Sequence, residues 1–244
     1  MTLIRGRRVV GVGLGLALLV AACGGSSSTA NPIGGGGGGG GGNSLTSGLS
    51  SNLDQLTSYR FSWTVFGASS GGAGSPMSTG SFATTGVVIN KPTKAISVNS
   101  FGLQYIQVGS QTWSSFDGTS WYPADTSTDI STFLPTKDYA QWFDTNSTQF
   151  TSAGDETKNG VACTHFKGNS SLSALYAGIA GVSANFQADL WVAKEGNYPV
   201  SGVYGFTASA GGQAGSFGYS FDITNVNDAS NKVTAPTNVI ALPS

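Results

Sequence analysis

The chain has few charged side chains and a single histidine, which narrows the functions open to it. Charged residues make up 9% of the 244 residues, with 11 Lys and Arg against 12 Asp and Glu. A chain this poor in basic residues has no patch of the kind that binds nucleic acid. One histidine, two cysteines and dispersed carboxylates offer no cluster of metal ligands. We therefore expect no nucleic-acid partner, no metal and no other cofactor.

The pair that most resembles catalytic machinery is Cys163 and His165. On a strand, residues two apart share a face. They also lie roughly 6.5 Å apart along the strand, which is longer than the hydrogen bond that a Cys–His dyad needs. No third side chain is indicated that would orient the histidine. We predict a structural role for both residues, no catalytic residue and no enzymatic activity.

Cysteine is scarce, and one of its two positions, Cys23, has an informative context. It follows Ala21 and Ala22, an apolar run from Val9 to Val20 and three arginines near the start. This order is typical of a secretory signal, and a cysteine directly after the small residues indicates a bacterial lipobox. A run of twelve residues is short of the roughly 20 that span a bilayer. We predict a signal peptide at 1–22 and a lipidated Cys23 that anchors the protein on the extracytoplasmic side of the cell membrane.

The next segment, residues 23–42, has almost no side chains that could form a core. It is mostly Gly and Ser and includes an unbroken glycine run from Gly34 to Gly42. Such a chain behaves as a flexible coil, so we predict a tether between the anchor and a folded domain at 43–244. Without the three signal arginines, 8 basic residues stand against 12 acidic ones. That balance does not favour adhesion to anionic lipid, and attachment is assigned to the lipid anchor.

The domain at 43–244 alternates between two hydrophobic periods. A leucine stripe at a helical spacing predicts a helix over 44–57, and further helices are expected at 130–143 and 171–181. Between them, period-two alternation and tight turns such as Asp117-Gly118 and Asn159-Gly160 predict an antiparallel meander. The stretch from Gly67 to Gly80 is expected to be a long loop, and the chain after Asp228 to be loosely ordered. Strands are expected at 61–65, 81–89, 95–101, 103–108, 111–116, 120–122, 150–158, 161–167, 185–194, 198–209 and 216–226.

This order predicts an α+β fold in which helices cover one face of a curved antiparallel sheet. All 13 Phe, 8 Tyr and 5 Trp follow the tether. Most are expected to fill the core, but an apolar cavity between sheet and helices, suited to acyl chains, is an equally good interpretation. The residues predicted to line it are Trp63, Val65, Phe101, Ile106, Trp113, Leu175, Ile179 and Trp191.

Two segments carry a resemblance to a known family. The first is Lys158 to Gly168, with its Asn-Gly turn and following strand. The second is Ala188 to Gly196, where a Trp-Val pair precedes an acidic-Gly turn. With the leucine-containing helix between them, they resemble the LppX/LprA/LprF/LprG family of actinobacterial lipoproteins. The polyglycine tether, the Gly67–Gly80 loop and Cys163 depart from the family's pattern.

The resemblance implies a half-barrel antiparallel sheet with helices over its concave face, similar to LolA, LolB and RseB. It also implies proteins that bind or carry lipids and lipoglycans across the cell envelope. It brings no catalytic residues. We therefore predict a membrane-anchored lipoprotein that binds or carries a lipid or lipoglycan at the cell envelope. The alternative is an envelope sensor or protein-interaction module that uses the same fold without carrying a ligand. An envelope protein partner belongs to that second hypothesis.

Overall fold

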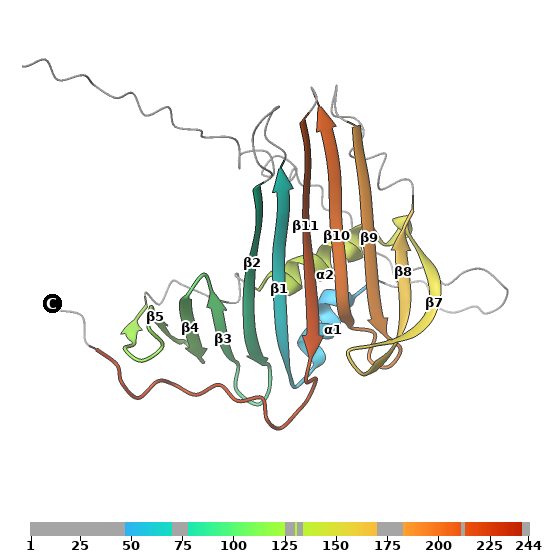
Figure 1. Ribbon diagram of the computed structural model, residues 1–244. Coiled ribbons are helices and arrows are strands. Elements are labelled where there is room, and N and C mark those ends of the chain that lie inside the picture. Colours follow the sequence, from blue (N-terminus) through green and yellow to red (C-terminus); the bar gives the residue numbers. More distant parts are fainter. Residues whose placement is uncertain are drawn as a thin grey trace, which may run out of the picture. The chain divides into compact units, whose positions relative to one another are not determined.

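The computed structural model describes residues 47–69, 78–124, 130, 134–169, 183–210 and 213–240 (Figure 1). The predicted signal peptide, the tether and the helix expected at 171–181 lie outside these residues and stay predictions. Within the described part of the chain, no helix is long and apolar enough to cross a membrane.

Eleven strands form one sheet in the order β6-β5-β4-β3-β2-β1-β11-β10-β9-β8-β7. Every pairing is antiparallel, and only β1 with β11 joins strands that are not consecutive, so the first and last strands meet mid-sheet (Figure 1). Over the described residues, β6 and β7 are the two edge strands of the sheet. They do not pair with each other, so the sheet stays open. The strands are β1 Ser58–Ser69, β2 Ser78–Ile89, β3 Ala95–Ser100, β4 Leu103–Val108, β5 Gln111–Ser115, β6 Tyr122–Pro123, β7 Phe150–Lys158, β8 Val161–Gly168, β9 Ser183–Ala193, β10 Pro199–Ala210 and β11 Gln213–Thr224.

The hairpin of β1 and β2 is longer than the sequence suggests. Its ladder continues through Gly67, opposite Gly80, up to Ser69 opposite Ser78. The loop predicted from Gly67 to Gly80 therefore includes residues that belong to β1 and β2. Glycine is a weak strand former by itself, but here β11 pairs with the same stretch of β1 on its other side. Hydrogen bonds from both neighbours outweigh the local preference.

Tight turns connect the strands where their residues predicted them. Asn159 and Gly160 have φ values of 52° and 78°, the left-handed backbone of a two-residue hairpin loop. At the other predicted turn, Gly118 has φ 73°. The Oδ1 atom of Asp117 accepts hydrogen bonds from the amides of Thr119 at 2.8 Å and Ser120 at 2.7 Å. These backbone donors hold the pKa of Asp117 well below its usual range.

Two helices are described, α1 Leu49–Gln55 and α2 Pro135–Thr145, with a short 3-10 turn at Ser147–Gln149 after α2. α1 is shorter than the predicted 44–57 because Gly48, with φ 99°, interrupts the helical backbone before Leu49. Its N-terminus is capped from the other helix. Asp144 accepts hydrogen bonds from the amides of Gly48 at 2.8 Å, Leu49 at 2.9 Å and Ser50 at 3.2 Å.

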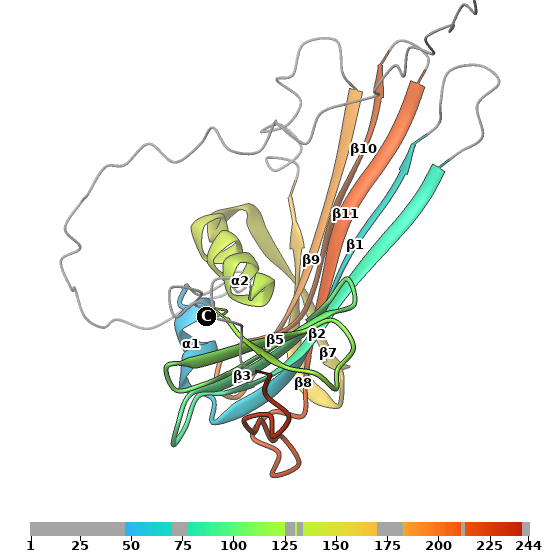
Figure 2. The same ribbon diagram turned by 90° about the vertical axis from the view of Figure 1, so that its left-hand side faces the viewer.

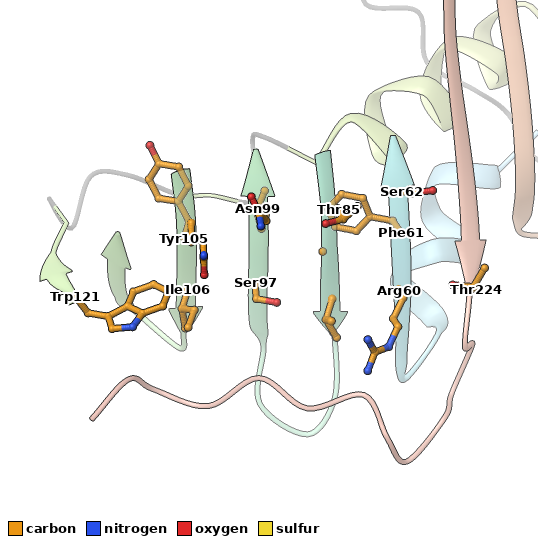
Figure 3. Close-up of a pocket in the computed structure, with 14 residues that line it drawn as sticks. Arg60, Phe61, Ser62, Thr85, Ser97, Asn99, Tyr105, Ile106, Trp121 and Thr224 are labelled. Carbon is orange, nitrogen blue, oxygen red and sulfur yellow. The ribbon is translucent and has the colours of Figure 1, made fainter. Parts of the chain in front are cut away.

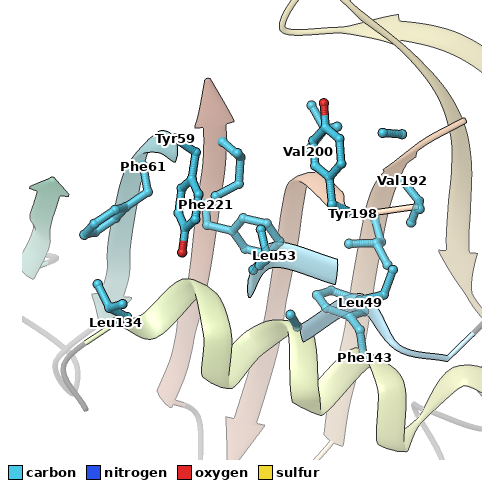
Figure 4. Close-up of a cluster of buried hydrophobic side chains, with 14 of the residues drawn as sticks. Leu49, Leu53, Tyr59, Phe61, Leu134, Phe143, Val192, Tyr198, Val200 and Phe221 are labelled. Atoms are coloured by element: carbon cyan, nitrogen blue, oxygen red, sulfur yellow. The ribbon is translucent and has the colours of Figure 1, made fainter. Parts of the chain in front are cut away.

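Both helices lie on the concave side of the curved sheet, which confirms the predicted α+β half-barrel arrangement (Figure 2). The core fills the space between them (Figure 4). Leu49 and Leu53 of α1 and Phe143 of α2 are almost fully buried against Phe61 of β1 and Phe221 of β11. The leucine stripe thus has the role that its spacing predicts.

Residues 229–240 are ordered, contrary to the expectation from the polar composition of the chain after Asp228. Asn231 is buried, and its Nδ2 donates to Ser58 Oγ at 2.9 Å and to the carbonyl of Asn225 at 2.6 Å. Farther along, the amide of Trp121 donates to the carbonyl of Asn238 at 3.0 Å, and Val239 forms a parallel bridge with Trp121. Specific hydrogen bonds at two points therefore hold a segment that lacks hydrophobic periodicity.

Candidate functional site

Aromatic side chains cross the concave face of the central strands in register. Trp63 of β1 lies opposite Phe221 of β11, Val65 lies opposite Tyr219, and Tyr219 lies opposite Tyr204 of β10. Directly opposite residues point to the same face, so these pairs form rows across the sheet. We call this surface the aromatic face; it consists of Trp63, Val65, Phe82, Phe186, Tyr204, Phe206, Phe217 and Tyr219.

Two aromatic rings of α2, those of Tyr139 and Trp142, lie over one part of the aromatic face. This part consists of Trp63, Tyr204 and Tyr219. The ring centroid of Tyr139 is 5.2 Å from that of Tyr219 and 6.2 Å from that of Trp63. One helical turn on, Trp142 is 5.0 Å from Tyr204. Such ring pairs are stabilising beyond the area that they bury. Burial, followed by the neighbouring Tyr219, raises the pKa of Tyr139 above its ordinary value.

Burial decreases along the strands beyond α2, although the side chains stay apolar. At the level of the helices, Phe61 and Phe221 are nearly inaccessible to solvent. Farther from the helices, the side chains are only half-buried at Val65 of β1, Phe206 of β10 and Phe217 of β11. Phe82 of β2, opposite Val65, is 53% exposed. No residue of the aromatic face carries a charge. The described structure therefore presents an apolar, uncharged surface that continues past its closed core.

Gly202 of β10 leaves room for the ring of Phe221, which borders the aromatic face. A Cβ atom at Gly202 of β10 would lie 2.4 Å from Cε1 of Phe221, closer than two carbon atoms can approach. The Phe221 ring thus occupies the space beside the Gly202 backbone that a side chain would need. The spacing of aromatic residues alone did not reveal this close approach.

The structure describes six of the eight predicted lining residues and places them on different surfaces. Trp63 and Val65 lie on the aromatic face. Phe101 lies in the β3–β4 turn with 71% of its surface exposed. Its ring centroid is 5.2 Å from that of Phe82, at the margin of the same face, with the two ring planes tilted by 43°. Leu175 and Ile179 lie outside the described residues.

The other three predicted residues point away from the helices. Ile106 of β4 lies opposite Trp113 of β5, on the face behind buried Val98 and its partner Tyr105. Trp191 of β9 lies between Leu190 and Val192, which both belong to the core, so its side chain projects to the convex side. The apolar character of these three residues does not reveal which face of the sheet they occupy. That face depends on which neighbouring residues of the strand the helices cover.

Trp191 belongs to a convex cluster that includes the single histidine. His165 stacks on Trp191 with centroids 4.4 Å apart. Its Nε2 lies 2.8 Å from Asp189 Oδ1, and its Nδ1 lies 3.1 Å from Glu156 Oε1. The Nε1 of Trp191 donates to the same Glu156 carboxylate. Carboxylates thus engage both ring nitrogens of His165.

The thiol of Cys163 has a hydrogen-bond partner other than His165. Its thiol is fully buried and lies 3.3 Å from the carbonyl oxygen of Val161, and burial raises its pKa. A buried thiol with a raised pKa is a poor nucleophile. The structural roles of Cys163 and His165 stay predictions.

Comparison with known proteins gives structural matches only. No family model and no curated protein matches the chain. Among solved structures, the lipoprotein LppX of Mycobacterium tuberculosis matches with 14% identity and a TM-score of 0.35, over 75% of this chain and 93% of LppX. A DUF1329 family protein from Desulfovibrio piger matches with 14% identity and a TM-score of 0.23, over 75% of this chain and 92% of its own.

A lipoprotein-sorting protein domain from Vibrio parahaemolyticus matches with 8% identity and a TM-score of 0.22, over 71% of this chain and 86% of its own. At these identities and scores the matches do not indicate what this chain binds, and its function is inferred below from its own residues.

Proposed function

We propose that this protein is a membrane-anchored lipoprotein that binds the acyl chains of a lipid or lipoglycan on its aromatic face. The observation that carries the proposal is the continuation of the aromatic rows beyond α2, where Val65, Phe206 and Phe217 are only half-buried. An uncharged apolar surface of this kind is typical of a ligand or partner site rather than of free protein surface.

The chemistry of the aromatic face suits hydrocarbon. Each methylene group moved from water to an apolar surface contributes about 0.8 kcal/mol. A chain with several buried methylenes is therefore held without any charged contact. Trp63 and Val65 keep their proposed lining role, with Phe101 at the margin. Leu175 and Ile179 are proposed to complete the site from the segment expected as a helix.

The proposed anchor complements this site. Lipidated Cys23 would keep the domain at the extracytoplasmic surface of the cell membrane, and residues 23–42 would let it turn there. An acyl ligand could then pass between the bilayer and the aromatic face with little exposure of its chains to water.

Native lipid extraction is the most direct test. The protein is purified from its own host in a mild detergent, and its bound lipids are identified by mass spectrometry. We expect co-purifying lipid in stoichiometric amount, and recovery free of lipid would overturn the carrier proposal.

A matched pair of variants locates the ligand. Phe82→Ser removes a ring from the aromatic face, and Phe116→Ser removes one from the β5–β6 turn, where it is 80% exposed. Both rings are largely exposed, so neither change should unfold the domain. In domain 43–244, we expect Phe82→Ser to weaken binding of cis-parinaric acid, a fluorescent fatty acid, by about tenfold and Phe116→Ser to leave it unchanged. Equal effects would argue against the aromatic face.

The exposed Phe82–Phe101 pair also favours the second candidate function, an envelope sensor or protein-interaction module. Exposed aromatic side chains are common anchors at protein interfaces. The same experiments separate the two functions. A lipid-free native protein, with Phe82→Ser causing loss of a co-purifying envelope protein, would support the module.

A further inference from the structure

A hollow lies on the convex face of the sheet, away from α1 and α2 (Figure 3). It has a volume of about 400 Å³ and is lined by β1 to β4, with Trp121 at one end and Thr224 at the other. The register arranges its convex side chains in two rows. The upper row is Ser62, Thr85, Asn99 and Gln104, and the lower row is Arg60, Val87, Ser97 and Ile106.

The upper row has unused hydrogen-bonding capacity. Over the residues that the structure describes, none of its four side chains forms a hydrogen bond with another group of the protein. The same row continues into Asp222 of β11 and Ser115 of β5, and both of these are partnered. Asp222 accepts from Asn159 at 2.9 Å, and Ser115 donates to Asp117 at 3.0 Å. Along this row, the four unpartnered side chains thus lie over the hollow, and the two flanking ones are partnered.

Arg60 adds a cation to the lower row. Its Nε donates to Asn231 Oδ1 at 3.1 Å, and its Nη2 lies 3.5 Å from the carbonyl oxygen of Ser230. Both acceptors are neutral, and within the described residues no carboxylate forms an ion pair with Arg60. A guanidinium group has five N–H donors, so several remain for a ligand.

The C-terminal segment 228–240, which we call the strap, holds both ends of the hollow. It binds Arg60 through Asn231 and holds the backbone of Trp121 through Asn238 and Ile240. Figure 3 shows it running along the foot of the hollow. These contacts give Arg60 and Trp121 defined positions before any ligand arrives, which lowers the entropy cost of binding.

We propose that this hollow binds a short oligosaccharide. Sugar hydroxyls both donate and accept hydrogen bonds, and the Ser, Thr, Asn and Gln side chains of the upper row do the same. Ile106 and Trp121 provide apolar contact for the C–H face of a sugar ring. The upper row crosses three inter-strand gaps, about 14 Å, a length that suits a few linked rings. The site lies on the face opposite the proposed acyl site and does not depend on it.

The test uses the full chain in phosphatidylcholine nanodiscs. Maltotriose, cellotriose and triacetylchitotriose are titrated while the fluorescence of the tryptophans is followed, and binding is confirmed by calorimetry. We expect at least one trisaccharide to bind with a millimolar or lower Kd. The double substitution Asn99→Ala with Gln104→Ala should weaken binding by about tenfold or more, because two hydrogen-bonding side chains are lost. Gln111→Ala on β5, an exposed glutamine outside the hollow, is the matched control and should bind as wild type.

The ligand could be a free glycan or the sugar of a glycolipid. Nanodiscs that contain digalactosyl diacylglycerol, probed with the same variants, distinguish the two sources, and binding of either one with loss in the double variant supports the proposal. Three outcomes overturn it. These are no binding of any trisaccharide or of the glycolipid, equal binding by the double variant and Gln111→Ala, and binding of inorganic phosphate alone, which would make Arg60 a simple anion site.

Discussion

The cap that α2 supplies to α1 allows a stability prediction to be worked out from three distances. Asp144 accepts the amides of Gly48, Leu49 and Ser50 at 2.8, 2.9 and 3.2 Å. The first amides of a helix have no partner inside the helix, and removal of a capping side chain typically costs about 1 kcal/mol. Hydrogen bonds to a charged group are worth more, about 1.5–3 kcal/mol.

We therefore expect Asp144→Ala to lower the free energy of unfolding by about 2 kcal/mol. For a domain of this size that corresponds to a fall in Tm of about 4–8 °C. Asp144→Asn keeps one oxygen that can accept two of the amides but loses the charge, and it should lie between Ala and wild type. Thermal and urea denaturation of domain 43–244, followed by circular dichroism, measure both.

Asp54→Ala is the matched control, because it removes the other polar link between the helices. Asp54 pairs with Lys137 at 2.8 Å, and both side chains are about half exposed. An exposed ion pair contributes about 0–1 kcal/mol, so this variant should lose much less stability. If Asp144→Ala and Asp54→Ala were equally mild, the cap would not hold α1 in place, and the reasoning would be refuted.

Four further predictions concern the Asp117 carboxylate, the Cys163 thiol, the lipid anchor and the tether. Asp117 has a lowered pKa in the folded state, so its contribution to stability is present above the ordinary carboxyl pKa of about 3.9 and is lost as pH falls below it. Asp117→Asn should therefore lower Tm at pH 7 and show a smaller further loss towards pH 3 than wild type, and parallel curves would contradict this. Cys163 is fully buried, so maleimide should label it slowly in the native protein and quickly in denaturant; fast native labelling would show an accessible thiol. Cys23→Ala should release correctly processed protein from membranes, and shortening Gly34–Gly42 by a few residues should leave folding and ligand affinity unchanged. A processed but still membrane-bound Cys23→Ala protein would disprove the lipid anchor.

Much of the local structure was predictable because it depends on neighbouring residues. Alternation at Phe61, Trp63 and Val65 predicted β1, and Asn159-Gly160 predicted a tight hairpin turn. The leucine stripe predicted a helix, although Gly48 shortens it. The C-terminal segment was misjudged because a few hydrogen bonds, among them those of Asn231, hold it rather than a periodic apolar face.

The candidate sites were harder to predict, because they depend on contacts between distant parts of the chain. Alternation shows that Trp63 and Trp191 each point to one face of a strand, but only the position of the helices shows that these faces are opposite. The row from Ser62 to Gln104 exists because four strands align in register, and each of its residues by itself is an ordinary surface residue.

The sequence by itself determined the class of this protein: its strands, its turns, its open antiparallel meander and the signals that predict export and lipidation. These follow from periodicity and from backbone preferences that act over a few residues. The tertiary structure alone decided which apolar side chains form the aromatic face, which polar ones surround the convex hollow, and that carboxylates of Glu156 and Asp189 enclose His165. Pairing β1 with β11 and folding the helices onto one face brings together residues more than 100 positions apart, and no local pattern encodes that meeting.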